Sequence, residues 1–338
     1  MQVSENYSLK KLNTFGIDVS AKFFSDLTSE ADIREIILSD KFQKEEKFVL
    51  GGGSNILFTK NLHAFCLHNC IKGIEIVREN NDDAFVKAHG GDVWHEMVLF
   101  CISKNLGGIE NLSLIPGSVG ATPIQNIGAY GVELKDIFYE LEAIHLISGD
   151  KVVFKSEDCR FGYRDSIFKR EMKNKFLISS VTLRLSKNPK FNTSYGAIEK
   201  ELEAMGISTL SIQSISQAVI NIRRSKLPDP SVIGNAGSFF KNPEVSEEKF
   251  TEMKKSHPMI VGHATKHHTV KLAAGWLIEQ CDWKGFRSGN VGMHKQQALV
   301  LVNYGNASGK ELYEHAFKVQ QSVKEKFDVL LEMEVNIL

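Results

Sequence analysis

The sequence has no surplus of either charge. Lysine plus arginine and aspartate plus glutamate each number 41, so the formal net charge of the 338-residue chain is zero. Proteins that bind nucleic acid through its phosphates need a basic surplus, so we expect no nucleic-acid partner. A local anion site made of backbone amides and a few basic side chains remains compatible with this balance.

Long hydrophobic runs are missing too. The N-terminal segment MQVSENYSLKKLNTF has no apolar core of signal-peptide length. No run of about 18 apolar residues occurs anywhere in the sequence. We therefore expect a cytoplasmic protein with no membrane partner, long enough for two or three domains.

Cysteine is scarce, and the five cysteines are an odd set without disulfide-framework spacing. In a chain of this length they indicate reduced thiols. Cys66, His68 and Cys70 lie close together in AFCLHNC. Their spacing fits one face of a short strand, and no second ligand pair with zinc-site spacing accompanies them. We therefore predict no metal site.

Three familiar motifs are absent as well. GGGSNILF lacks the third glycine of the dinucleotide fingerprint and continues into a β-type sequence. The P-loop pattern does not occur, and neither Ser54 nor Ser238 sits in a G-x-S-x-G elbow. These absences argue against a plain Rossmann dehydrogenase, an ATPase and an α/β-hydrolase.

The elements that are present alternate between strands and helices. KFVLGGGSNILF reads as strand, glycine turn and strand, and residues 94–106 have helical spacing. Strands are predicted at FYELEAIHL and FLISSVTLRL. SISQAVINIRRSK is predicted as a helix, with a capping box at Ser214 and Gln217, that ends before Pro228 and Pro230. We place a domain boundary at this stop.

The C-terminal third continues this mixture, which predicts an α+β fold. VKLAAGWLIEQC reads as a helix and QALVLVNYG as a strand. A long amphipathic helix is expected from about residue 310 to 327, with Ser308 and Glu311 as its capping box. The chain ends in the predicted strand VLLEMEVNIL, with Met333, Val335 and Ile337 on one face. Glu332, Glu334 and Asn336 occupy the other face.

Two glycine-rich segments are candidates for binding an anion. Gly51–Asn55 can form a nest, because successive glycines accept positive φ and let N–H groups converge on a phosphate. An ordinary glycine-rich hairpin is the alternative. Residues 116–121 form a second such element within 107–134, a stretch too apolar for a solvated linker. Two small-residue loops suit a ligand with a pyrophosphate and a flat ring.

Eight segments in one order resemble the UDP-N-acetylenolpyruvoylglucosamine reductase (MurB) family. They are LNTFGI, LGGGSNILF, IPGSVGATPIQNIGAYGVE, CRFGYRDSIFK, KLPDP, GNAGSFFKNP, KLAAGWLI and HKQQALVLVN. The resemblance extends from about residue 8 to the C-terminus. The segment around Tyr195 and Gly196 is similar to the tyrosine loop of the type I branch, in which a tyrosine folds over bound substrate.

The resemblance implies a two-part FAD-binding domain of the PCMH/vanillyl-alcohol-oxidase type and an α/β substrate-binding C-terminal domain that covers the flavin. The expected limits are 1–70 and 71–225 for the two FAD-binding parts and 226–338 for the substrate domain. The last strand would carry Glu334 back to the active site. FAD is the implied cofactor and NADPH the co-substrate, and we expect a monomer.

The resemblance also implies site residues. Arg164, Ser238 and Glu334 are the expected catalytic three. The expected substrate-binding residues are Tyr163, Tyr195, Lys226, Asn242 and Gln297. The expected FAD contacts are Gly51, Gly52, Gly53, Ser54, Asn55, Pro116, Gly117, Ser118, Gly120, Ala121, Asn126, Gly128 and Tyr130.

The implied reaction reduces the enolpyruvyl ether of UDP-N-acetylglucosamine, in peptidoglycan precursor synthesis that supports cell shape and division. Hydride addition to the terminal vinyl carbon pushes charge toward the substrate carboxylate. A guanidinium such as Arg164 suits that charge, and Ser238 would give the proton to the adjacent carbon. Glu334 can help only if protonated or paired with Arg164.

Two features depart from the family pattern. Met333 stands before Glu334 where the type I pattern has proline. The segment PMIVGHATKHHTVK also differs, so His263, His267 and His268 are expected to be surface histidines without a role.

Two other functions remain open at this point. An oxidase of the same flavin fold could use oxygen and often tethers its flavin through His or Cys, so that the colour would stay with the denatured chain. A binding protein for a UDP-sugar or flavin would oxidise no NADPH.

Overall fold

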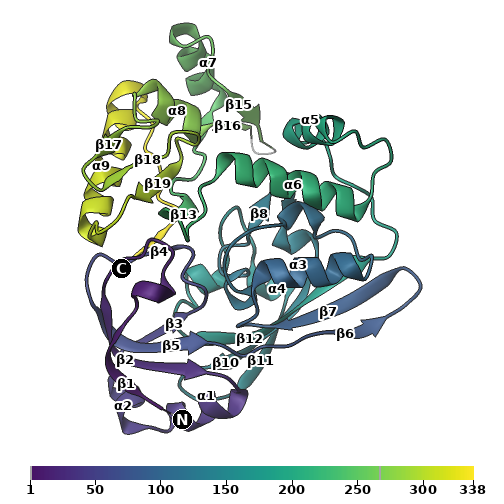
Figure 1. Cartoon of the computed structure of the whole chain (residues 1–338), viewed down its shortest axis with the longest axis vertical. Coiled ribbons are helices and arrows are strands. Elements are labelled where there is room, and N and C mark those ends of the chain that lie inside the picture. The colour runs from purple at the N-terminus through teal and green to yellow at the C-terminus, as the bar shows by residue number, and fades with distance from the viewer. Residues whose placement is uncertain (1, 266–267) are drawn as a thin grey trace. The chain divides into compact units, whose positions relative to one another are not determined.

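The computed structural model describes residues 2–265 and 268–338. The chain divides into two compact units (Figure 1). The first comprises Met1–Tyr7, Ser20–Gly53 and Leu62–Ser225. The second comprises Ser8–Val19, Ser54–Asn61 and Lys226–Leu338. Helices and strands are mixed throughout, which confirms the α+β class, and no helix among the described residues is both long and apolar enough to cross a membrane.

A four-stranded sheet opens the first unit in the order β1-β2-β5-β3. Its strands are β1 (Ser4–Ser8), β2 (Ser20–Leu27), β5 (Leu62–Asn69) and β3 (Lys47–Leu50). β5 runs parallel to both β2 and β3. The helices α1 (Glu30–Ile37) and α2 (Asp40–Lys44) pack their apolar faces on this sheet, because Ile33, Ile36 and Phe42 share one buried cluster with Phe65 and Leu67.

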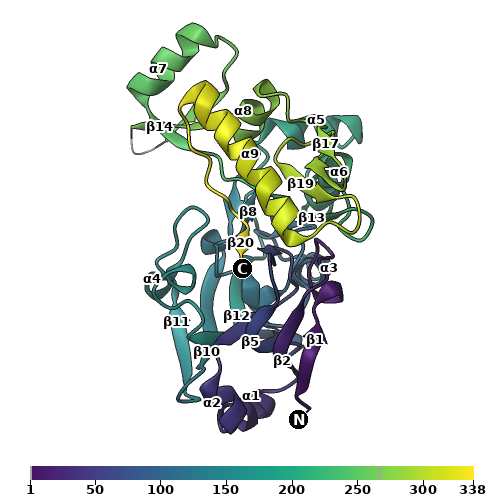
Figure 2. The same cartoon turned by 90° about the vertical axis from the view of Figure 1, so that its left-hand side faces the viewer.

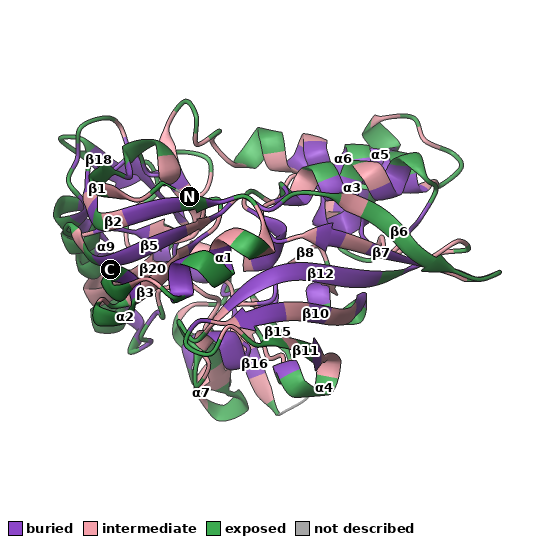
Figure 3. Ribbon diagram, turned by 90° about the horizontal axis from the view of Figure 1, so that it is seen from below, coloured by how far each residue is buried: buried purple, intermediate pink, exposed green. Residues whose placement is uncertain are grey.

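An antiparallel sheet forms the rest of the first unit, in the order β11-β10-β12-β7-β6. Its strands are β11 (Lys151–Lys155), β10 (Phe138–His145), β12 (Phe176–Ser186), β7 (Asp83–His89) and β6 (Ile74–Glu79). The central strand β12 is buried along most of its length, whereas the edge strand β6 is mostly exposed (Figure 3). Helix α3 (Trp94–Ser103), close to its predicted limits, buries Trp94, Met97 and Val98 in the same core as this sheet.

The predicted capping box of helix α6 (Ile212–Lys226) is wrong. The helix begins two residues earlier than expected, so Ser214 lies inside its first turn. Ser211 and Ser214 instead exchange hydrogen bonds, Ser214 N–H to Ser211 Oγ at 3.0 Å and Ser211 N–H to Ser214 Oγ at 2.9 Å. A second small core joins α6 to helix α5 (Gly196–Ala204) through Ile198, Leu202 and Val219.

The first unit also contains a two-stranded ladder and several short helical turns. These are β8 (Gly128–Ala129), β9 (Val132–Glu133), α4 (Ser156–Cys159), η2 (Glu110–Leu112), η3 (Val119–Ala121), η4 (Leu134–Asp136) and η5 (Ile167–Lys169).

The second unit contains three small sheets. The first has the order β13 (Gly234–Ser238), β19 (Val300–Asn303), β18 (Val291–Met293) and β17 (Arg287–Ser288). The second has the order β14 (Glu244–Ser246), β16 (Thr269–Leu272) and β15 (Gly262–Ala264). The third pairs β4 (Ile56–Leu57) with β20 (Asn336–Ile337) in parallel. The remaining elements of this unit are η1 (Lys10–Leu12), α7 (Glu247–Ser256), α8 (Ala274–Gln280) and α9 (Gly309–Phe327).

The long helix α9 matches its prediction. Ser308 caps it, and the reciprocal contact with Glu311 completes the capping box. Its buried face, which includes Leu312, Ala316 and Val319, contacts β18 and β19, and Figure 2 shows α9 beside β19. The helix predicted from VKLAAGWLIEQC begins only at Ala274, because Thr269–Leu272 form strand β16.

The predicted C-terminal strand is mostly wrong. Only Asn336–Ile337 form a strand, β20, while Met333 makes a single bridge to Phe240. The chain therefore pairs with two different partners in succession rather than with one, which breaks the alternation of faces.

His263 and His268 are exposed as expected, and His267 lies outside the described residues.

The carboxylate of Glu142 on β10 contacts side chains from three other strands of the antiparallel sheet. Glu142 on β10 accepts hydrogen bonds from Lys87 Nζ on β7 at 2.7 Å and from Ser180 Oγ on β12 at 2.8 Å. Lys151 Nζ on β11 lies 3.1 Å from the same carboxylate. Burial alone would raise the pKa of Glu142, but hydrogen bonds from Lys87, Ser180 and Lys151 lower this pKa to about 2.

We predict that Glu142→Gln lowers the stability of the fold at neutral pH. We also predict that the stability of this variant falls less steeply as the pH is lowered. The folded pKa lies below that of the unfolded chain, so the carboxylate stabilises the fold above pH about 4.5 and loses this effect as pH falls toward 2. Urea unfolding between pH 7 and about pH 3 measures it. Glu140→Gln on the same strand is the matched control. A decline as steep in Glu142→Gln as in the wild type would contradict the prediction.

Candidate active site

The two glycine-rich segments of the first unit lie directly against each other. A Cβ atom on Gly51 would be 2.2 Å from Ser118 Oγ, and one on Gly52 would be 3.0 Å from Gly117 Cα. The Gly52 N–H donates to Ser118 Oγ over 3.3 Å. Gly53 has a φ of 59°, a conformation that favours glycine. Segments far apart in sequence therefore form one backbone surface.

The second segment is ordered, as its composition predicts. The Gly120 N–H donates to Gly90 O at 2.9 Å, and the Val119 N–H donates to Asp92 O at 2.8 Å. Trp94 N–H donates to Gly117 O at 3.0 Å. A Cβ on Gly120 would lie 3.0 Å from Gly90 Cα, so this contact also depends on missing side chains.

Asn126 connects the glycine-rich run to the turn that holds Arg164. Its φ is 44°, and its side chain is fully buried. Its amide nitrogen donates to Gly162 O at 2.9 Å, and its amide oxygen accepts from the Lys135 N–H at 3.0 Å. The side chain of Asn126 therefore fixes the protein's own backbone.

Arg164 lies in a tight turn with a left-handed backbone. The Gly162 N–H donates to Asp165 O at 2.9 Å, and Arg164 has a φ of 54°. This conformation costs a residue with a Cβ about 1–2 kcal/mol, and such strain is common at functional sites. Arg164 Nη2 donates to Gly128 O at 2.8 Å, so the guanidinium is held against the glycine-rich run.

A second guanidinium lies near the first. Arg223 on α6 donates from Nε to Leu114 O at 3.2 Å and lies close to Tyr130. Burial and the charge of Arg164 lower the pKa of Arg223. Two cations close together in partly buried positions attract an anion.

Two tyrosines of the first unit, Tyr195 and Tyr163, pack near Tyr130 and Arg164. Tyr195 precedes α5, is 55% exposed, and packs edge-on against the Tyr130 ring with centroids 5.5 Å apart. The Arg164 Cζ lies 5.6 Å from the Tyr163 ring centroid. Tyr195 thus contacts Tyr130, which lies close to Arg223, and Arg164 contacts both Tyr163 and Gly128.

In the second unit, Ser238 and Glu334 lie on neighbouring segments. The Glu334 N–H donates to Phe239 O at 2.8 Å, and the Lys241 N–H donates to Glu332 O at 2.9 Å. Phe239 in turn donates from N–H to Leu299 O at 2.8 Å. Two segments of the second unit that are distant in sequence therefore pair here, and Glu334 hydrogen-bonds to the residue that follows Ser238.

Asn55 has a contact that the sequence did not predict. Its side-chain amide donates to Glu334 O at 3.3 Å, and its own carbonyl accepts from the Asn336 N–H at 3.1 Å. In the second unit Asn55 therefore fixes the backbone at Glu334.

The remaining expected substrate residues differ in their surroundings. Asn242 uses its side-chain oxygen to accept the Ala274 N–H at 3.0 Å, where α8 begins. Gln297 is half-buried and accepts from the Leu299 N–H at 3.4 Å. Lys226, the last residue of α6, is exposed.

Comparison with known proteins decides the family. A model described as "FAD binding domain" matches residues 22–152, and one described as "UDP-N-acetylenolpyruvoylglucosamine reductase, C-terminal domain" matches residues 229–338. The chain is 49% identical to the UDP-N-acetylenolpyruvoylglucosamine reductase of Amoebophilus asiaticus, over all of both chains. It is 48% identical to that of Flavobacterium johnsoniae over the full length of both, and 45% identical to that of Pseudomonas aeruginosa, covering 100% of this chain and 99% of the relative. This chain belongs to the UDP-N-acetylenolpyruvoylglucosamine reductase family.

The fold agrees with this assignment. The crystal structure of a UDP-N-acetylenolpyruvylglucosamine reductase from Thermus caldophilus has a TM-score of 0.68 to this chain, covering 99% of it and 98% of that chain, at 20% identity. The resemblance found in the eight sequence segments is thereby confirmed, and so is the FAD-binding fold.

The residues present fit the flavin cofactor of the reductase family. FAD carries a pyrophosphate and a flat ring system, and both need close approach to backbone. The facing loops of the first unit have no Cβ at Gly51, Gly52, Gly117 and Gly120, and Gly53 and Gly117 have positive φ. Backbone N–H groups and the Ser118 hydroxyl are the donors that such a surface offers.

One basic residue near Arg164, Arg223, was not singled out by the sequence interpretation. Arg223 occupies an apolar position of α6, four residues after Val219 and eight after Ile215, both of which are buried. An arginine on the buried face of an amphipathic helix is unusual, and that position could have marked it as functional.

We predict that Gly51→Ala destabilises the first unit and weakens FAD binding, because the new Cβ would meet Ser118 Oγ. Overpacking of this kind costs about 1–3 kcal/mol. Thermal unfolding and fluorescence titration with FAD measure the two effects.

A second substitution tests the cause. Removing the hydroxyl in Gly51→Ala/Ser118→Ala should restore most of the lost stability, because Ser118 Cβ lies 3.5 Å from the added atom. Ser118→Ala alone is the control. No recovery in the double variant would show that the clash is not the cause.

Proposed function

We propose that this chain reduces UDP-N-acetylglucosamine enolpyruvate to UDP-N-acetylmuramate, with NADPH as electron donor and FAD as bound cofactor, in peptidoglycan precursor synthesis. The observation that carries this proposal is the 49% identity to a reductase over the full length of both chains. We further propose that the enzyme acts in the cytoplasm as a monomer.

When bound, FAD would pass on the hydride that NADPH provides. The facing loops of the first unit would hold it, through Gly51–Gly53 and residues 116–121. Ser54, Asn55, Asn126, Gly128 and Tyr130 complete the proposed set. Asn126 and Asn55 each hydrogen-bond to protein backbone through the side-chain amide. This supports an indirect role, in which each would fix the backbone beside the cofactor.

Arg164 would bind the carboxylate of the enolpyruvyl group. Hydride addition at the vinyl carbon moves negative charge onto this carboxylate, and a guanidinium can meet it with two parallel hydrogen bonds. The position of Arg164 against Gly128 O supports this role, because the side chain is already oriented. The nearby Arg223 adds positive potential without needing to touch the substrate.

Ser238 would give a proton to the carbon next to the carboxylate. A serine hydroxyl is a weak acid in water, but the carbanionic intermediate is a strong base, so a hydroxyl held within hydrogen-bond reach suffices. The backbone of its neighbour Phe239 is bonded on both sides, to Leu299 and to Glu334. This supports a fixed position for the donor.

Glu334 would act beside Ser238. The Glu334 N–H and the Asn55 amide each anchor the backbone of this residue. A free carboxylate would repel the developing charge, so the role of Glu334 requires a proton on it or a basic partner. Tyr163, Tyr195, Lys226, Asn242 and Gln297 would hold the UDP-sugar.

A direct assay tests the proposed function. Purified enzyme with FAD, NADPH and UDP-N-acetylglucosamine enolpyruvate should oxidise one NADPH for each substrate and yield a product two hydrogens heavier by mass spectrometry. NADPH oxidation that needs oxygen and leaves the UDP-sugar unchanged would contradict the proposal and favour an oxidase.

We predict that Ser238→Ala separates the two half-reactions. NADPH should still reduce the flavin at nearly the wild-type rate, while reoxidation by the enolpyruvyl substrate slows by about 10²–10⁴-fold, the usual contribution of a general acid. Anaerobic stopped-flow absorbance measures both rates. Ser256→Ala, at an exposed serine of α7, is the control. Wild-type reoxidation in Ser238→Ala would remove the proton-donor role.

We predict that Arg164→Lys lowers turnover by about 10²–10³-fold, because an ammonium replaces the planar fork with a single point charge. Steady-state kinetics measures this loss. Arg170→Lys is the matched control, since Arg170 lies six residues further along the chain and pairs with Asp165 at 3.1 Å. Full turnover in Arg164→Lys would exclude Arg164 from the mechanism.

A further inference from the structure

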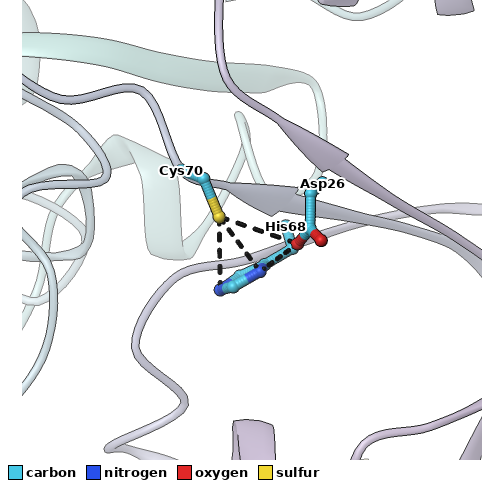
Figure 4. A group of neighbouring side chains, drawn as sticks. All are labelled: Asp26, His68 and Cys70. Carbon is cyan, nitrogen blue, oxygen red and sulfur yellow. Dashed lines mark hydrogen bonds and ion pairs between the residues drawn. The ribbon is translucent and has the colours of Figure 1, made fainter. Parts of the chain in front are cut away.

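We propose that Asp26, His68 and Cys70 form a binding site for a divalent transition-metal ion of the zinc class. The three side chains converge at one end of the parallel sheet (Figure 4). Asp26 lies near the end of β2, His68 near the end of β5, and Cys70 directly after β5. Carboxylate, imidazole and thiolate are the three ligand types that zinc prefers.

One of the three distances between donor atoms already suits a tetrahedral ion, and the other two would lengthen when the ion binds. Bonds of 2.0–2.3 Å at tetrahedral angles place two ligand atoms about 3.3–3.8 Å apart. Cys70 Sγ lies 3.2 Å from His68 Nδ1 and 3.6 Å from Asp26 Oδ1. His68 Nδ1 and Asp26 Oδ1 are 2.6 Å apart, and this hydrogen bond would open by about 0.8 Å when a metal takes the proton's place.

The fold holds these ligands in place without the metal. Asp26 and His68 are paired across the parallel strands β2 and β5. The Cys70 N–H donates to Leu27 O at 2.8 Å, so the residue after Asp26 fixes Cys70. The Asp26 side chain is 55% exposed, which leaves the site open for entry and for a water molecule as fourth ligand.

The sequence-based reasons against a metal site do not apply to this set. They concerned Cys66, His68 and Cys70 and the lack of a second ligand pair. In the structure, the third side chain beside His68 and Cys70 is Asp26 and not Cys66. Asp26 comes from another strand and lies 42 residues before His68.

The surroundings argue against a nucleophilic cysteine at this site. Burial and the negative charge of Asp26 raise the pKa of Cys70 to about 11, although Lys72 lowers it somewhat. Nucleophilic cysteines have a lowered pKa beside cations. A dication bound between the Cys70 thiolate and the Asp26 carboxylate would attract both negative charges. It would therefore favour loss of the thiol proton on binding.

Cobalt(II) is the probe for this site, because tetrahedral Co²⁺ absorbs at longer wavelengths than oxidised flavin and a thiolate ligand adds a near-ultraviolet charge-transfer band. The thiols of the FAD-loaded enzyme are first reduced, and the reductant is then removed. The enzyme is titrated anaerobically with CoCl₂ and afterwards with ZnCl₂. We expect one Co²⁺ per chain with both features, and displacement by Zn²⁺, which nitrogen and sulfur ligands bind more tightly.

Variants locate the site. Cys70→Ser, His68→Gln and Asp26→Asn should each weaken Co²⁺ binding at least about tenfold, and Cys70→Ser should also remove the charge-transfer band. The controls are Cys281→Ser, a half-buried cysteine elsewhere, and His63→Gln, an exposed histidine on the same strand β5. Both should bind Co²⁺ like the wild type. Because Asp26 is exposed, Asp26→Asn should fold normally.

Two results would overturn the proposal. One is that the wild type acquires no tetrahedral Co²⁺ spectrum. The other is that binding survives Cys70→Ser, which would place the ion on other residues, such as the exposed His263. Reduction of the flavin by NADPH, measured in the same samples, shows whether each variant retains its proposed activity, so failure of the metal site is distinguishable from failure of the enzyme.

Discussion

The close contact between two glycine loops is the constraint on which the first unit depends. Gly51–Gly53 directly follows the parallel strand β3, and Gly117–Gly120 precedes Asn126 and Tyr130 in the run 107–134. A Cβ on Gly51 or Gly52 would meet the second loop, and a Cβ on Gly120 would meet Gly90. The missing side chains therefore let three backbone segments meet, and the same bare backbone is what a pyrophosphate and a flat ring require. The packing of these loops and the cofactor binding proposed for them would share one physical cause.

In the second unit, strand pairing positions the two residues proposed to be catalytic, Ser238 and Glu334. Glu334 and Ser238 come from segments about a hundred residues apart in the sequence, and the pairing of residues 239–241 with 332–334 joins them. This pairing also explains how Met333 fits. The two hydrogen bonds around the bridge use the N–H groups of Lys241 and Glu334, so the ladder does not use the N–H of Met333. A proline, which has no N–H, would satisfy the same pairing.

Features fixed by local chemistry could be predicted from the sequence, and features made by contacts between distant segments could not. The box of Ser308 and Glu311 was correct because a cap depends on four neighbouring residues. The box at Ser214 failed because Ser211 satisfied the same rule one turn earlier. The last strand was overestimated, since alternation does not reveal that the chain changes partner after Met333. Asp26 beside Cys70, and Arg223 beside Tyr130, depend on tertiary contacts that no spacing encodes. The site residues came from the family resemblance, and their roles stay predictions.

An anaerobic absorbance titration tests the central claim most directly, that this chain passes hydride from NADPH through FAD to an enolpyruvyl UDP-sugar. The purified yellow enzyme is first bleached with one equivalent of NADPH, and UDP-N-acetylglucosamine enolpyruvate is then added in steps. The account predicts full recovery of the oxidised flavin spectrum at one equivalent of substrate, without oxygen. A bleached enzyme that recovers only when air is admitted would contradict it.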